Sequence, residues 1–314
     1  IAEAKGARVA FDLPKVKNQE TIYHITANKP GAPLIYRVRV FEPNKISSFY
    51  SKTKSNPPIR TFVFVPKSLS PNTKVILVMH GMSRTAFSYI KSWKQWAEKN
   101  NHIVIAPKFD SKNWKGSRKY NLGNMFARKA RKQSRAKWTF QIVEDLFTKT
   151  KSGFGLKTKH YDMFGHSAGG QFVNRFMLFM PDAKVRFAFA ANPGWYTLPD
   201  LELRYPYGLK HKNLKRTARD LHRWSEKKLF LLRGTDDTER TSNLRQTKEA
   251  DTQGRNRYER AGFMFEQMKT INPKTNWRLI DAPQVGHDQK GMAQATQLIL
   301  DWIGSKSKTV EKLH

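Results

Sequence analysis

Apolar and polar residues follow two different patterns along the chain. In the first 65 residues they alternate in three stretches rich in β-branched and aromatic side chains, at 21–26, 34–40 and 60–65. Such alternation is typical of antiparallel strands that have one face exposed to solvent. We therefore predict that these strands extend one edge of a larger sheet.

From residue 74 onward, continuous apolar runs replace the alternation, and runs of this kind predict strands that are buried on both faces. They occur at 75–79, 103–106, 161–165, 185–190, 229–232 and 277–280. Helical spacing of apolar residues marks the segments between them, at 89–97, 138–148, 169–180, 258–268 and 292–303. Strands that alternate with helices predict right-handed βαβ units, hence an α/β fold with a mostly parallel central sheet and helices on both faces.

This pattern divides the 314 residues into three parts. We predict a loosely held basic arm at 1–18, a single α/β domain at 19–304 and a basic tail at 305–314. Two long insertions, at 110–137 and 195–228, interrupt the domain after the carboxyl ends of strands. Open α/β sheets bind ligands at that edge, so we expect both insertions to lie over the active site.

The centre of the pattern is a Gly-x-Ser-x-Gly turn, Gly165–Gly169, between a predicted strand and a predicted helix. This order is that of a nucleophile elbow, in which a strained turn exposes a serine hydroxyl. Ser167 is therefore the candidate nucleophile.

A serine needs a base, which an acid must orient. The candidate base is His287, in the loop between the last strand and the last helix, and the candidate acid is Asp237, just past the preceding strand. Asp236 is a close rival for the acid and Asp288 a weaker one. The order Ser, Asp, His is that of α/β-hydrolases.

The oxyanion of such a reaction needs preorganised N–H donors, and we expect them from the backbones of Ala168 and Met82. His80, in the loop that carries Met82, either supports that loop by hydrogen bonding or packs there. His166 is expected to pack under the elbow rather than to titrate in catalysis. It is counted among the candidate substrate-binding residues, with Trp195 and Tyr196. Aromatic residues of the insertions either line a groove for a chain substrate or pack each insertion onto the domain: Trp114, Tyr120, Trp195, Tyr196, Tyr205, Tyr207 and Trp224.

Composition narrows the chemistry further. The chain has no Cys, which excludes disulfides, thiolate nucleophiles and Cys-based zinc sites. It has no His-x-x-x-His pattern and no Gly-x-Gly-x-x-Gly turn, so neither a metal nor a redox cofactor is expected.

Its 58 Lys and Arg against 25 Asp and Glu give a net charge of +33, a field that attracts anionic polymers. No nucleic-acid motif is present, and no specific nucleic acid is expected. The chain begins at Ile1 without Met and has no apolar run of 18 residues, so we expect no transmembrane segment and an exported, periplasmic or secreted protein.

The chain resembles the α/β-hydrolase superfamily in four segments: the elbow, His80-Gly81, Gly234-Thr235-Asp236-Asp237 and Gly286-His287. Within it the chain is similar to the poly(3-hydroxybutyrate) depolymerase-like hydrolases, a group that includes enzymes attacking poly(aspartic acid). Three segments carry this closer resemblance: 93–107, Asn192-Pro193-Gly194-Trp195-Tyr196, and Gln253-Gly254-Arg255-x-x-Tyr258-x-Arg260. The resemblance implies a Ser167, Asp237 and His287 triad and ester or amide hydrolysis without a cofactor.

We expect a serine hydrolase of carboxylic esters, with a polymer such as a polyester as substrate. The alternatives are an amide hydrolase of an anionic polymer such as poly(aspartic acid), and a non-catalytic protein that binds polyanions through the basic residues of 112–137.

Overall fold

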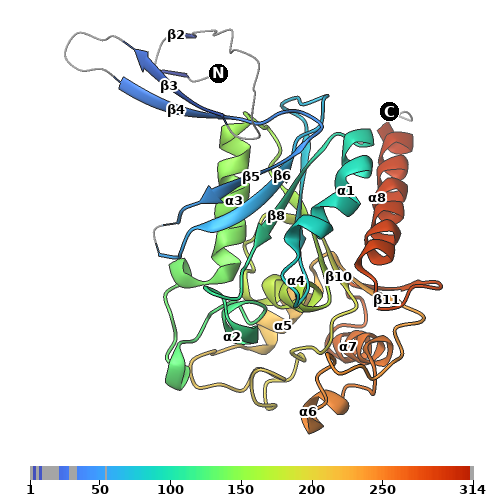
Figure 1. The fold of residues 1–314 in the computed structure, drawn as a ribbon. Helices are drawn as coiled ribbons and strands as arrows, with labels where there is room; N and C mark the ends of the chain where they lie inside the picture. Colours follow the sequence, from blue (N-terminus) through green and yellow to red (C-terminus); the bar gives the residue numbers. More distant parts are fainter. Residues whose placement is uncertain (1–2, 5–6, 9–20, 28–33, 54, 312–314) are drawn as a thin grey trace.

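A mostly parallel sheet of eight strands forms the centre of the molecule (Figure 1). The structure is a computed structural model that describes residues 3–4, 7–8, 21–27, 34–53 and 55–311. The strand order is β12-β11-β10-β9-β7-β8-β6-β5, and only β6 and β5, at one edge, run antiparallel to their neighbours. The strands are β5 (Ile46–Ser51), β6 (Ile59–Phe64), β7 (Lys74–Met79), β8 (His102–Lys108), β9 (Tyr161–His166), β10 (Val185–Ala191), β11 (Leu229–Gly234) and β12 (Arg278–Ala282).

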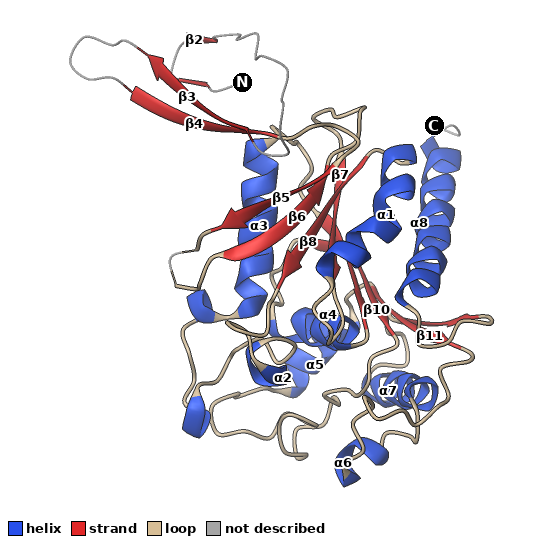
Figure 2. Cartoon of the chain, viewed as in Figure 1, coloured by secondary structure: helices blue, strands red, loops and turns tan. Residues whose placement is uncertain are grey.

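Apolar residues on both faces of the sheet explain why helices cover both (Figure 2). In β7, Val75 and Leu77 belong to one buried cluster, whereas Ile76 and Val78 belong to the other. Helices α1 (Ala86–Lys99) and α8 (Gln289–Glu311) complete the second cluster. The first cluster is completed by α3 (Thr139–Gly153), α4 (Ala168–Phe179), α5 (Ala218–Ser225) and α7 (Arg257–Ile271). The predicted fold class is therefore confirmed.

The prediction for the antiparallel edge was wrong in one respect. Strands β3 (Thr21–Ala27) and β4 (Leu34–Val40) pair with each other in a separate two-stranded sheet and do not join the central one. The edge is formed instead by β5, which the sequence pattern did not indicate. Its sequence, Ile-Ser-Ser-Phe-Tyr-Ser, has too few apolar residues for a clear alternation, since an edge strand needs only one well-packed side.

The termini differ in how much of them the structure describes. Within the predicted arm, Glu3–Ala4 pairs with Ala7–Arg8, while residues 1–2, 5–6 and 9–18 lie outside the described residues. Helix α8 was expected to end near residue 303 but continues to Glu311, so most of the predicted tail is helical. Among the described residues, no helix has the length and apolar character to cross a membrane. A periplasmic or secreted location stays a prediction.

Three long segments follow the carboxyl ends of strands. The two predicted insertions follow β8 and β10 and carry α2 (Gly116–Lys119), two short 3-10 turns at Arg128–Ala130 and Arg135–Lys137, and α5. A third segment, 235–256, follows β11 and carries α6 (Lys248–Asp251). The sequence pattern did not single it out as an insertion, although it supplies part of the site described below.

Candidate active site

Ser167 lies at the turn between β9 and α4 in a backbone conformation that L-residues seldom adopt. Its φ is 58° and its ψ is −119°. The turn is tight because two glycines leave no room for a side chain. A Cβ on Gly169 would lie 2.1 Å from the carbonyl oxygen of Met79, and one on Gly165 would lie 2.2 Å from that of Gly169. Strand and helix therefore approach at backbone contact, and the serine is pushed out at the carboxyl end of the sheet.

A continuous chain of hydrogen bonds joins Ser167, His287 and Asp237. The Nε2 of His287 lies 3.1 Å from the Oγ of Ser167, and its Nδ1 lies 2.7 Å from Oδ2 of Asp237. Because a carboxylate only accepts, Nδ1 carries the proton and Nε2 is left to accept from the serine hydroxyl. This tautomer is the one that a base for serine requires.

The two rival carboxylates are engaged elsewhere. Asp236 is exposed and accepts a hydrogen bond from the hydroxyl of Thr235, and Asp288 accepts one from the backbone N–H of Gly291. Asp237 is buried, with 3% of its surface exposed, and it alone of the three contacts the His287 ring. Asp237 lies one residue further past the end of β11 than Asp236, and its side chain points inward.

A buried arginine stands behind the acid, and sequence reasoning missed it. Nη1 of Arg257 lies 3.2 Å from Oδ1 of Asp237, and both side chains are almost fully buried. Its Nη2 donates to Oδ1 of Asn243 at 2.6 Å. Burial lowers the pKa of Arg257, and the attraction of Asp237 offsets part of that effect. In the sequence Arg257 is one basic residue among 58 Lys and Arg, and no local pattern marks it as the partner of Asp237.

Asn192 joins the loops that carry the acid and the base. Its Oδ1 accepts from the backbone N–H of Gly234 at 2.8 Å, and its Nδ2 donates to the carbonyl of Gly286 at 3.0 Å. Asn192 is fully buried and has a φ of 43°. The turn before Asp237 and the loop before His287 are thus held at a fixed separation by one side chain.

His80 holds the loop on which Met82 lies. The backbone N–H of Phe109 donates to its Nε2 at 3.0 Å, so its Nδ1 carries a proton and donates to the carbonyl of Gly81 at 2.9 Å. Burial lowers the pKa of His80 to about 3, which keeps the ring neutral. Of the two roles considered for His80, the structure shows hydrogen bonding.

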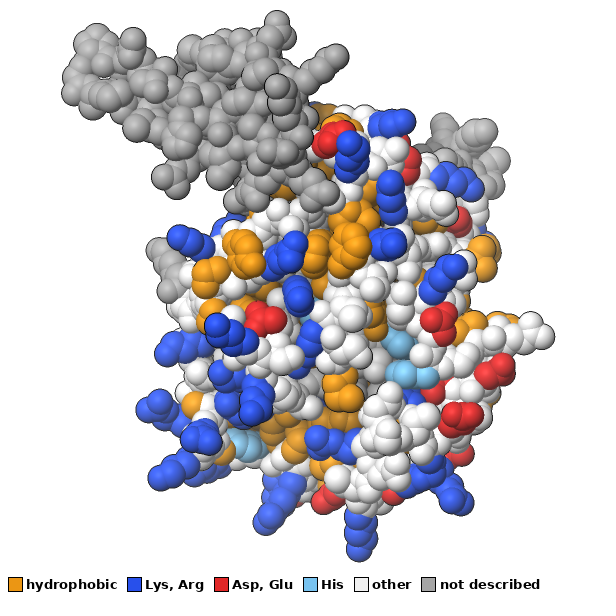
Figure 3. All heavy atoms as spheres, in the orientation of Figure 1, with side chains coloured by type: hydrophobic (Ala, Val, Ile, Leu, Met, Phe, Trp, Pro, Cys, Tyr) orange, Lys and Arg blue, Asp and Glu red, His pale blue; other side chains and the backbone are white. Residues whose placement is uncertain are grey.

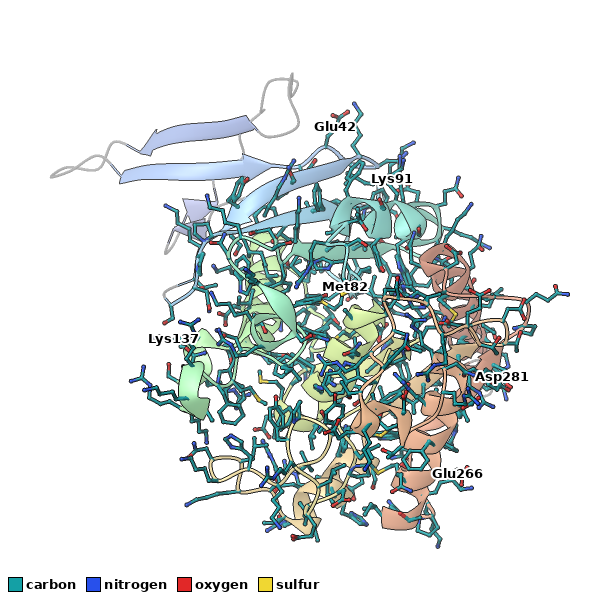
Figure 4. The ribbon with its side chains drawn as sticks, turned by 60° about the horizontal axis from the view of Figure 1, so that its bottom comes forward. Glu42, Met82, Lys91, Lys137, Glu266 and Asp281 are labelled. Atoms are coloured by element: carbon teal, nitrogen blue, oxygen red, sulfur yellow. The ribbon has the colours of Figure 1, made fainter. Side chains whose placement is uncertain are left out.

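The expected oxyanion donors both border the cavity beside Ser167. Ala168 is the first residue of α4, where N–H groups have no partner within the helix. Met82 is 60% exposed and lies near the centre of the molecule in Figure 4.

His166 is packed beneath the elbow as expected. Its Nδ1 lies 3.0 Å from the hydroxyl of Tyr89, and its ring centroid lies 4.6 Å from that of His287. Burial lowers the pKa of His166 well below 6.5, and His287 and Arg257 act in the same direction. The ring is therefore neutral, and it supports the imidazole above it.

A cavity of about 570 Å³ opens over Ser167. Of the predicted substrate-binding residues, His166 and Trp195 line it. Tyr196 does not, which corrects that prediction, because its ring is buried in the core and its backbone N–H donates to Gln253. Among the aromatic residues of the insertions, Tyr120 and Trp195 line the cavity.

The charged side chains that line the cavity are Arg84, Arg245, Arg257 and Asp288, and of these Arg257 is already paired with the buried Asp237. Arg245 comes from the segment 235–256. It lies over the ring of Trp195, 4.7 Å from the centroid, and donates to the hydroxyl of Tyr207 at 3.1 Å. In the described part of the chain, no carboxylate pairs with Arg245, so its charge is available to the cavity. Arg84 donates to the carbonyls of Phe109 and Trp114 and anchors the first insertion.

Two solved structures are similar to this chain in both sequence and fold. The poly(aspartic acid) hydrolase-1 from Sphingomonas sp. KT-1 is 35% identical and superposes with a TM-score of 0.79 over 82% of this chain and 98% of that one. LpqC, a poly(3-hydroxybutyrate) depolymerase from Bordetella parapertussis, is 29% identical, with a TM-score of 0.75 over 81% and 87% of the two chains. The chain belongs to the poly(3-hydroxybutyrate) depolymerase-like α/β-hydrolases. These are serine hydrolases, as the resemblance implied.

More distant structures share the fold alone. An S-formylglutathione hydrolase from Agrobacterium tumefaciens is 14% identical, with a TM-score of 0.55 over 90% of this chain and 97% of that one. No protein-family model matches the sequence, and a comparison with curated proteins finds no match. Within the described residues of this depolymerase-like hydrolase, no three His, Cys, Asp or Glu side chains gather in a way that would hold a metal ion.

Replacement of Arg257 by Leu should destabilise the protein strongly. Removing one member of a buried ion pair leaves the other charge uncompensated, which costs about 3–5 kcal/mol of unfolding free energy. Urea unfolding of Arg257→Leu and of the double variant Arg257→Leu/Asp237→Asn measures this, and the double variant should recover part of the loss. Arg223→Leu, at an exposed pair with Asp182, is the control and should change little. Additive losses in the double variant would show that Arg257 and Asp237 do not stabilise each other.

Proposed function

We propose that this protein hydrolyses carboxylic esters through an acyl-enzyme, with Ser167 as nucleophile, His287 as base and Asp237 as the orienting acid. The observation that carries the proposal is the unbroken hydrogen-bond chain from Ser167 through His287 to Asp237 at the strained elbow. Membership in a family of serine hydrolases supports it.

In the first step, Oγ of Ser167 attacks the carbonyl carbon while Nε2 of His287 takes the hydroxyl proton. The charge that develops on the carbonyl oxygen is stabilised by the backbone N–H groups of Ala168 and Met82. The Met82 loop is held in place before the substrate arrives, because His80 fixes it by two hydrogen bonds.

The remaining steps use the same groups in reverse. The imidazolium of His287 gives its proton to the leaving alkoxide, and the alcohol departs. A water molecule then attacks the acyl carbon while His287 takes one of its protons, and His287 returns that proton to Oγ of Ser167 as the bond to the acyl group breaks and the carboxylic acid leaves. Asp237 stabilises the imidazolium at both stages, and Arg257 keeps the acid's side chain in one orientation.

Replacement of Ser167 by Ala should abolish ester hydrolysis. Removal of the nucleophile lowers kcat by roughly 10⁴-fold or more in serine hydrolases of this kind. Turnover of p-nitrophenyl butyrate measures the effect. Ser83→Ala, at the cavity wall but outside the hydrogen-bond chain, is the matched control and should keep its rate. Retention of the wild-type rate in Ser167→Ala would contradict the proposal.

A second candidate is amide hydrolysis in an anionic polymer such as poly(aspartic acid). The specific observation in its favour is Arg245, a cation in the cavity wall that has no carboxylate partner among the described residues. An uncharged polyester offers such a cation only neutral carbonyl acceptors, whereas a carboxylate on the substrate would form a charge-assisted pair with it. The relative from Sphingomonas is by name a poly(aspartic acid) hydrolase, which agrees with this reading.

The role of Arg245 predicts a selective loss in Arg245→Gln. The p-nitrophenyl monoester of succinic acid and p-nitrophenyl butyrate have acyl chains of equal length, but only the first ends in a carboxylate. A charged hydrogen bond contributes about 1.5–3 kcal/mol, so kcat/KM should fall roughly tenfold or more for the succinate and little for the butyrate.

Lys91→Gln removes the same charge from the exposed face of α1 and is the control (Figure 4). This control variant should leave kcat/KM unchanged for both esters. An equal effect of Arg245→Gln on both esters would mean that Arg245 shapes the cavity without binding an anion.

A further inference from the structure

Two segments of the chain contain many basic residues and no acidic ones. Residues 112–137 carry ten Lys or Arg without an Asp or Glu, and residues 204–219 carry six without an Asp or Glu. They are far apart in the sequence and belong to the two predicted insertions.

The fold brings these segments together. The side-chain amide of Asn213 donates to the carbonyl of Ala130 at 3.0 Å. The ring of Phe126 lies 4.3 Å from that of His211 and 5.5 Å from that of Tyr205, measured between centroids. In Figure 1 the two insertions lie side by side at the lower left of the molecule, and Figure 3 shows that Lys and Arg side chains gather on the surface there.

The second segment forms a hollow of about 740 Å³ beside this contact, separate from the cavity over Ser167. Its rim is basic, with Arg204, Lys210, Lys212, Lys215 and Arg216. Lys210 pairs with Glu202 and Arg216 pairs with Asp220. Within the described residues, the other three and the neighbouring exposed side chains of Arg128, Lys129, Arg131 and Lys132 have no carboxylate partner. We name this surface, residues 128–132 and 204–216, the basic rim.

So many unpaired cations around one hollow repel each other unless an anion lies among them. The rim fits a chain that carries repeated negative charges. Nucleic acid is one such chain, but proteins that bind single strands stack bases on exposed aromatic rings. In the two basic segments the described aromatic rings are buried or half-buried in packing contacts, such as those of Trp114, Tyr120 and Tyr205. On the basic rim itself, every exposed residue is a Lys or an Arg, which favours a polycarboxylate.

We propose that the basic rim is a second binding site for a polycarboxylate chain, outside the active site, which holds a distant part of the polymer while Ser167 acts on another. The inference rests on the proposed function in its anionic-polymer form. The same two insertions supply both places. The active-site cavity is lined by Gly116, Ser117, Tyr120, Asn121 and Trp195, while 128–132 and 204–216 form the rim. A chain that leaves the cavity along the insertions therefore meets the rim next.

Binding is measured apart from turnover, in a Ser167→Ala background that cannot cleave the chain. The probe is long, fluorescently labelled poly(aspartic acid), followed by anisotropy at low and moderate salt. The triple variant Arg204→Glu/Lys212→Glu/Lys215→Glu should bind it roughly tenfold or more weakly and with a smaller salt dependence. Lys67→Glu/Lys91→Glu/Lys99→Glu carries the same charge change on exposed residues of another surface and should keep most of the affinity.

With Ser167 present, the triple variant should raise KM for the long polymer and leave turnover of p-nitrophenyl butyrate unchanged. Equal affinity of the rim variant and the Lys67/Lys91/Lys99 variant would overturn the proposal. If single-stranded DNA binds as tightly as poly(aspartic acid) and loses as much affinity in the triple variant, the polycarboxylate assignment is overturned. A wild-type protein that binds the polymer at the rim but hydrolyses neither ester nor polymer would instead overturn the proposed function.

Discussion

The contact between the backbones of β9, α4 and β7 determines the rest of the site. At Gly165 and Gly169, backbone carbonyl groups occupy the space that a Cβ would need. This close backbone packing forces Ser167 into a positive φ. Every other part of the site is aligned with that serine. His287 and Asp237 follow neighbouring strands, and Asn192 bridges their loops, so the parallel sheet sets the distances that the hydrogen-bond chain needs.

Buried charge is balanced in the site in a way that suits its chemistry. Asp237 and Arg257 neutralise each other in the interior, while His80 and His166 are neutral because burial lowers their pKa values. His287 is partly exposed and lies between Ser167 and the buried Asp237, with a hydrogen bond to each. The ion pair of Asp237 and Arg257 therefore fixes the carboxylate to which His287 is hydrogen-bonded, and the unpaired charge of Arg245 faces the cavity.

Much of this arrangement could be predicted from the sequence, because it depends on short-range patterns. Buried strands, the elbow and the loops of Asp237 and His287 all have local signatures, and the chain order linked them. The contacts of Arg257, Asn192 and Arg245 have none, since each depends on residues 14 to 94 positions away that only the fold brings near. Tyr196 was misplaced for the same reason, because its neighbour Trp195 faces the cavity and the sequence does not tell which of the two rings turns inward.

In the proposed function, the cations of the active-site cavity and those of the basic rim have different tasks. Arg245 at the cavity would select acyl groups that carry a carboxylate, whereas the exposed cations of the rim would attract a long chain without fixing its register. Such a division suits an enzyme whose substrate is larger than its site.

The central claim is that Ser167 is a nucleophile activated by His287. Reaction with a fluorophosphonate, followed by mass spectrometry of the digested protein, tests it most directly. We expect one adduct, on the peptide that contains Ser167, formed rapidly in the wild type and slowly in His287→Ala. An adduct on another residue, or equal labelling of the wild type and His287→Ala, would contradict it.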